Sequence, residues 1–81
     1  MYSHATETVL QAGVIEITNT YQVKCSIKYT AGGIFIDMRK WIVWPGFSDF
    51  RPTKKGIMLE CNIWRKALPM IQQLLDDNTK V

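Results

Sequence analysis

Basic and aromatic side chains, the groups in this chain best suited to binding chemistry, are concentrated between Lys24 and Lys55. This window holds seven basic and two acidic residues, a net charge of +5, whereas residues 1–23 carry −2 and residues 56–81 carry zero. It also holds six aromatic residues, and Tyr21 lies just before it. Cations bind phosphates and flat rings stack on unpaired bases, so this combination suits a groove for single-stranded nucleic acid. A surface made basic only for solubility would have no reason to concentrate its charge in this way.

Catalytic and metal chemistry have little support in the sequence. The single histidine, His4, lies in a polar N-terminal stretch, and no nucleophile elbow, phosphate-binding glycine loop or pair of carboxylates is present. Cys25 and Cys61 are 36 positions apart and belong to no Cys/His cluster. They permit a disulfide without implying one. We therefore expect a protein that is not an enzyme, with no catalytic residue, no metal and no cofactor.

The length of 81 residues allows one small domain with no room for a second core. We expect a flexible tail over residues 1–9, a folded domain over residues 10–76 and a frayed end over residues 77–81. Small domains often depend on a metal, a disulfide or a partner subunit for stability. Oligomerisation is the source of stability that we expect here.

The start of the chain shows no targeting signal. Residues 1–13 lack the basic start and apolar run of a secretory signal. No apolar stretch approaches the roughly 20 residues that cross a bilayer. We expect an intracellular protein with no membrane contact, cytoplasmic in a bacterium or virus and nuclear in a eukaryote.

Alternating apolar and polar residues predict four β-strands. The strands are expected over residues 14–18, 21–29, 34–44 and 54–59. Asn19-Thr20 and the segment from Thr30 to Gly33 supply turns between them. Pro45-Gly46 breaks the third strand. The segment from Phe47 to Thr53 is expected to be a loop that exposes its aromatic side chains, which either stack on bases or cap the sheet.

The parity of the third strand decides which side chains share a face. Ile34, Ile36 and Met38 lie on one face, and the odd positions from 35 to 41 lie on the other. If the first set packs on the core, Arg39 and Trp41 stand on the open face beside the lysines of the preceding strand. On a regular strand Trp41 and Trp44 would face opposite sides, so we expect one to be buried and favour Trp41 for stacking.

The C-terminal third predicts an amphipathic helix. Apolar residues recur every three or four positions from Ile63 to Leu75 and form one stripe. Glu60, Cys61 or Asn62 could begin the helix, and Asn62 offers the best N-capping chemistry. Pro69 removes one backbone hydrogen bond, so we expect a kink near Leu68, but one helix, because the stripe continues in phase. The order is β-β-β-β-α, with the helix on one sheet face and the other face open to solvent or a ligand.

Three sequence motifs carry a family resemblance. The segment Ile34–Arg39 (I-F-I-D-M-R), the segment Pro52–Leu59 (P-T-K-K-G-I-M-L) and the early helical Trp64 follow in order. Over about residues 21–75 this pattern resembles the C-terminal domain of the transcriptional coactivator PC4 (p15). The resemblance implies an α+β fold, a four-stranded antiparallel curved sheet followed by a kinked helix. It also implies a homodimer whose paired sheets form channels for single-stranded DNA.

The resemblance and the residue pattern together define the predicted site. By position, the resemblance assigns phosphate contacts to Arg39, Arg51, Lys54 and Lys55, and places Lys24 and Lys28 where the family's second strand is basic. The predicted nucleic-acid-binding residues are Lys24, Lys28, Tyr29, Arg39, Trp41, Trp44, Phe50, Arg51, Lys54 and Lys55.

Simpler explanations compete at several of these positions. Lys24 and Lys28 would also suit a solvated strand face, and Lys54 and Lys55 would protect a sheet edge against aggregation. Arg39 can pair with a nearby carboxylate without any ligand. The function we expect is sequence-independent binding of single-stranded DNA in transcription regulation, replication or repair, with transcription or replication proteins as further partners. The alternatives are an RNA-binding module that uses the same groove and an adaptor for an acidic protein partner.

Overall fold

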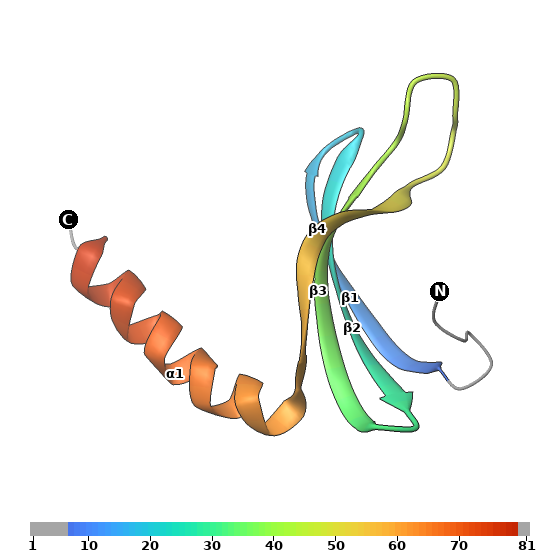
Figure 1. The fold of residues 1–81 in the computed structure, drawn as a ribbon. Helices are drawn as coiled ribbons and strands as arrows, with labels where there is room; N and C mark the ends of the chain where they lie inside the picture. The colour runs from blue at the N-terminus through green and yellow to red at the C-terminus, as the bar shows by residue number, and fades with distance from the viewer. Residues whose placement is uncertain (1–6, 80–81) are drawn as a thin grey trace.

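The computed structural model describes residues 7–79 as one four-stranded antiparallel sheet, in the order β1-β2-β3-β4, followed by one helix (Figure 1). The elements are β1 (Thr8–Thr18), β2 (Tyr21–Thr30), β3 (Gly33–Ile42), β4 (Arg51–Glu60) and α1 (Cys61–Asn78). The predicted α+β order β-β-β-β-α is confirmed. The strands bend along their length, so the sheet is curved (Figure 1).

The hairpin of β2 and β3 is the most regular part of the sheet. Its register runs without a break from Tyr21 opposite Ile42 to Thr30 opposite Gly33. At the turn, Thr30 Oγ1 accepts a hydrogen bond from the Gly32 N–H at 3.1 Å. Gly33 has a φ of 126°, which a glycine adopts without strain. The turn chemistry and the alternation of side chains therefore agree on one register.

Several element boundaries differ from those expected. β1 begins at Thr8, so the boundary at residue 10 falls inside a strand, and α1 ends at Asn78 rather than at residue 76. The first residues of β1 pair with the end of β2, and this backbone pairing needs no alternation of side chains. Residues 1–6 of the expected tail, and residues 80–81, lie outside the described residues. β3 ends at Ile42, and β4 begins at Arg51.

The helix does not cover a sheet face, which corrects the expected packing. α1 contacts β3 and β4 near its start and then runs away from the strands (Figure 1). Trp64 anchors it: this side chain is 6% exposed, and its Nε1 donates a hydrogen bond to the Ile36 carbonyl oxygen at 2.9 Å. The helix is continuous through Pro69. Of the three candidate start residues, Glu60 is the N-cap, without a side-chain hydrogen bond, and Asn62, the residue with the best capping chemistry, is not.

Because the helix points away, two apolar surfaces stay exposed. Within residues 7–79, Trp64 is the one buried apolar side chain. The helix stripe is exposed at Leu68, Ile71 and Leu74, and Ile34 is exposed on the sheet. A single copy of the chain therefore lacks a core of ordinary size for its length.

Two further expectations concern cysteines and membranes. Cys25 and Cys61 are both free thiols, half-buried in the structure. The helix in the described part of the chain is not long and apolar enough to span a membrane.

A substitution at Gly56 tests how closely β3 and β4 approach each other. A Cβ at Gly56 would lie 2.7 Å from the Met38 carbonyl oxygen and 2.8 Å from Arg39 Cα. The glycine therefore allows the backbones of β3 and β4 to approach closely. We expect Gly56→Ala to lower the free energy of unfolding by about 1–3 kcal/mol, because backbone must shift. Urea denaturation measures this change.

The matched control is Gly13→Ala in β1, where a Cβ would meet no atom within 4 Å. This change should be neutral or should stabilise by less than about 1 kcal/mol. An equal loss of stability in both variants would contradict the packing argument.

Candidate nucleic-acid interface

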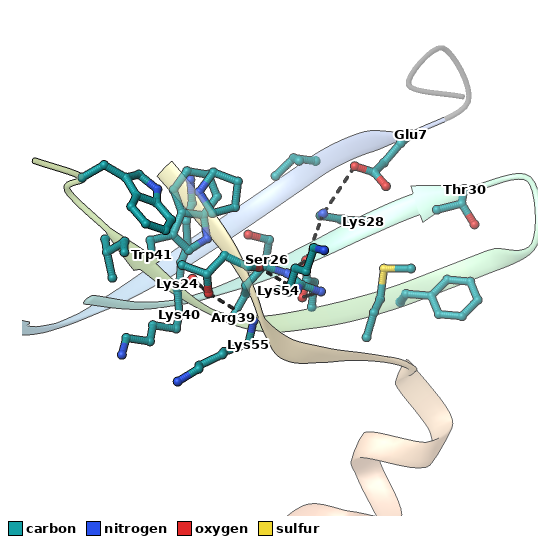
Figure 2. Close-up of a pocket in the computed structure, with 18 residues that line it drawn as sticks. Glu7, Lys24, Ser26, Lys28, Thr30, Arg39, Lys40, Trp41, Lys54 and Lys55 are labelled. Carbon is teal, nitrogen blue, oxygen red and sulfur yellow. Dashed lines mark hydrogen bonds and ion pairs between the residues drawn. The ribbon is translucent and has the colours of Figure 1, made fainter. Parts of the chain in front are cut away.

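One open groove runs along a face of the sheet (Figure 2). We call it the basic groove. Its lining includes Lys24, Ser26, Lys28, Phe35, Asp37, Arg39, Trp41, Trp44, Lys54, Lys55 and Met58, together with Glu7 and Val9 at the start of the chain. Three strands, β2, β3 and β4, thus contribute six basic residues to the groove lining: the five named above and Lys40.

The register of β2 and β3 explains why these cations converge. Lys24 lies opposite Arg39, and Ser26 lies opposite Asp37. Residues that are directly opposite in an antiparallel pair project from the same face. The prediction that Arg39 and Trp41 share a face with the lysines of the preceding strand is confirmed. Since α1 runs away from the sheet, this face stays open.

Lys54 and Lys55 both reach the groove because β4 is irregular there. Neighbouring residues on a regular strand face opposite sides, but the register of β3 and β4 shifts between Arg39 and Trp41. Thr53 holds this shift. Its Oγ1 donates a hydrogen bond to the Lys40 carbonyl oxygen at 2.8 Å and accepts one from the Lys55 N–H at 3.1 Å. No feature of the sequence had indicated this role of Thr53.

A buried carboxylate lies among the groove cations. Asp37 is 8% exposed, and its Oδ2 accepts hydrogen bonds from Lys28 Nζ and Arg39 Nε, each at 3.2 Å. Its Oδ1 lies 3.2 Å from Arg39 Nη2, an ion-pair contact without hydrogen-bond geometry. The pairing of Arg39 with a nearby carboxylate, considered from the sequence, is therefore present.

Lys28 has a second acidic neighbour. Glu7 Oε1 lies 3.3 Å from Lys28 Nζ, so this ammonium is placed between two carboxylates (Figure 2). Burial alone would lower the pKa of Lys28, but the hydrogen bonds and charges of Asp37 and Glu7 outweigh burial and raise the pKa above its ordinary value. Lys28 is therefore cationic at neutral pH.

The two tryptophans near the end of β3 both line the groove. Lys24 Nζ lies 4.3 Å from the centroid of the Trp41 ring, a cation–π contact. Trp44 is 46% exposed. The expectation that one of the two is buried is wrong, because β3 ends at Ile42 and strand alternation does not extend to Trp44.

Three predicted residues lie outside the groove lining. Tyr29 lies opposite Ile34 and is 56% exposed on the other sheet face. Phe50 and Arg51 lie where the long β3–β4 connection enters β4. The Arg51 guanidinium carbon lies 4.8 Å from the centroid of the Phe47 ring. The structure thus brings together seven of the ten predicted residues: Lys24, Lys28, Arg39, Trp41, Trp44, Lys54 and Lys55.

The groove lining also includes residues that the sequence did not predict. Lys40 is one of them, although its Nζ lies 4.4 Å from the centroid of the Tyr21 ring. Ser26 and Glu7 line the groove without having been predicted. The alternation of β2 contains the signal for Ser26, which lies between two groove lysines. The contact of Glu7 depends on the pairing of β1, for which the sequence offers no signal.

Comparison with known proteins identifies the fold. No protein-family model and no curated protein sequence matches this chain. A solved structure of a bacteriophage T5 homolog of the eukaryotic transcription coactivator PC4, implicated in recombination-dependent DNA replication, matches with a TM-score of 0.70 and 17% identity, over 85% of this chain and 80% of that chain. A PC4 homolog from Burkholderia pseudomallei matches with a TM-score of 0.66 and 18% identity, over 98% of this chain and all of that chain (100%). The chain therefore has a PC4-like fold, as its three motifs predicted.

Proposed function

We propose that this protein binds single-stranded DNA through the basic groove, as a homodimer and without sequence preference. The convergence of six basic residues and two tryptophans on the lining of one open groove carries this proposal. The fold likeness supports it, because both solved neighbours are PC4 homologs and the phage protein is implicated in DNA replication. On this basis the protein acts in transcription regulation, replication or repair, in contact with other proteins of that process.

The groove cations differ in their partners: Lys24 and Lys40 lie over aromatic rings, and the other four divide into two pairs. Lys28 and Arg39 are held by carboxylates, whereas Lys54 and Lys55 form no ion pair with any residue between 7 and 79. Lys54 and Lys55 are exposed and meet phosphates without first losing a partner. Their position beside a buried ion cluster gives the groove both free and fixed positive charge.

The shape of the site favours a single strand. Aromatic stacking requires unpaired bases, and stacking tolerates any base because every base has a π-face. Reading a duplex sequence usually requires a helix or a two-stranded ribbon in the major groove. Here α1 runs away from the sheet, so the groove offers rings and cations but no recognition helix (Figure 1).

The apolar surfaces of a single copy support the homodimer. The helix stripe and one sheet face are exposed together. Large apolar patches on a soluble protein mark contact surfaces. A second copy packed against α1 would bury this stripe and leave both grooves open.

Replacing the two free lysines should weaken binding and reduce its salt dependence. For Lys54→Ala/Lys55→Ala, the slope of log K against log salt should become shallower by about 1.4, since each phosphate contact contributes about 0.7 for single strands. Fluorescence anisotropy of labelled oligo-dT across several salt concentrations measures both quantities.

The matched control is Arg65→Ala/Lys66→Ala, which removes the same charge from exposed positions on α1. Its slope should stay at the wild-type value. Equal effects of the two double variants would instead indicate attraction by net charge alone. Weak binding that does not change in the Lys54/Lys55 variant would favour the protein adaptor, and equal affinity for a matched RNA strand would favour the RNA-binding module.

Oligo-dT should quench tryptophan fluorescence through the groove rings. Trp41→Phe and Trp44→Phe should each reduce the quenching, and Trp41→Ala or Trp44→Ala, which removes the ring, should cost about 1–3 kcal/mol of binding free energy. Trp64 is buried and does not face the bound DNA, so its fluorescence should stay constant during the titration. Unchanged quenching in the Trp41→Phe/Trp44→Phe double variant would exclude stacking at these rings.

If the protein is a homodimer, its mass in solution should depend on protein concentration. Light scattering should give twice the chain mass at micromolar concentration, and Ile71→Glu in the exposed stripe should shift the protein to monomer by burying an unpaired charge. Gln73→Glu, on the opposite side of α1, adds the same charge and should leave the dimer intact. A wild-type protein that stays monomeric at this concentration would refute the dimer.

A further inference from the structure

We propose that Asp37 is a positioning residue of the basic groove. Its buried carboxylate fixes Lys28 and Arg39 in place to meet phosphates, and so raises the affinity for single-stranded DNA despite its negative charge. This role rests on the proposed function and deepens it.

The location of Asp37 is unexpected for a surface that binds negatively charged phosphates. The side chain projects from the groove face, opposite Ser26 on β2 and Met58 on β4. A carboxylate on a phosphate-binding surface repels the ligand, and burying a charge costs free energy unless it is paired. A site selected only for positive potential would not hold an acid here.

The contacts of Asp37 compensate for the free-energy cost of burying its charge. Both of its oxygens face cations, and these cations come from two strands: Lys28 from β2 and Arg39 from β3, at 3.2 Å in each contact. The remaining Arg39 nitrogen, Nη1, donates a hydrogen bond to the Thr53 carbonyl oxygen of β4 at 3.0 Å. The Arg39 guanidinium is thus held at three of its nitrogens.

Fixing these side chains before the ligand arrives favours binding. Lysine and arginine lose considerable rotamer freedom when they are immobilised, and this loss opposes association. Around Asp37 the loss has already occurred in the free protein, so less of it opposes binding. The Asp37 carboxylate therefore weakens the electrostatic attraction of phosphates, but it lowers the entropy that the two cationic side chains lose on binding.

Glu7 provides a natural contrast within the same network. It contacts Lys28 at 3.3 Å and forms no other ion pair in the described part of the chain. Because Asp37 already holds Lys28, Glu7 adds competition for this ammonium and positions no second cation. The two carboxylates should therefore affect DNA binding in opposite directions.

Three carboxylate-to-amide variants test this difference, and each raises the net charge by one. Asp37→Asn should weaken oligo-dT binding about tenfold and make the salt slope shallower. Glu7→Gln should tighten binding about twofold to threefold. Asp49→Asn, at an exposed loop position paired with Arg51, should stay within twofold of wild type. Anisotropy titrations at several salt concentrations measure affinity and slope, and thermal denaturation monitors folding.

The outcomes separate the two proposals. Wild-type protein that fails to bind oligo-dT would overturn both. Wild-type binding, with a folded Asp37→Asn variant that binds equally or more tightly, would overturn only the role of Asp37. A purely structural role would lower the melting temperature and leave the salt slope of the folded fraction unchanged, which also overturns it.

A second comparison applies if Asp37→Asn does not fold. Asp37→Leu/Arg39→Met replaces a buried ion pair with apolar side chains, a change that proteins often tolerate. It is compared with Arg39→Met alone. Positioning of Lys28 by Asp37 predicts that the double variant binds no more tightly than the single variant. Tighter binding by the double variant would show a repulsive carboxylate and would overturn the proposal.

Discussion

The unbroken antiparallel register between β2 and β3 is the constraint on which the rest of the site depends. It aligns Lys24 with Arg39 and Ser26 with Asp37 on one sheet face. A slip of one residue in either strand would move the side chains of that strand to the opposite face. The turn from Thr30 to Gly33 fixes that register through local hydrogen bonds and a glycine with positive φ.

Within this frame, the groove combines two kinds of positive charge. Lys28 and Arg39 are paired with buried Asp37, whereas Lys54 and Lys55 are free of carboxylate partners among the described residues. Ordered cations limit the entropy lost on binding, and free cations provide long-range attraction. Thr53 joins the two groups, since it accepts a hydrogen bond from Arg39 through its carbonyl oxygen and holds the irregular stretch of β4 through its hydroxyl.

The helix explains why one copy of the chain looks incomplete. Trp64 fastens the first turn of α1 to Ile36 of β3, and the rest of the helix runs away with its apolar stripe exposed. The periodicity of residues 63–75 revealed an apolar stripe, but periodicity does not identify the surface against which the stripe packs. Packing on the chain's own sheet and packing on another copy satisfy the same pattern, because the hydrophobic effect is not directional.

Local rules in the sequence were enough to determine the order of elements, the parity of β2 and β3 and the shared face of Lys24, Lys28 and Arg39, since strand alternation and turn chemistry act between neighbours. Trp44, Thr53, Glu7 and the direction of α1 could not be obtained in this way. Each depends on where a strand stops, where a register shifts or which distant strand pairs, and these choices come from contacts between segments far apart in the chain. The sequence thus specified the side chains that β2 and β3 contribute to the groove, and long-range packing added the remaining lining residues and left the groove uncovered.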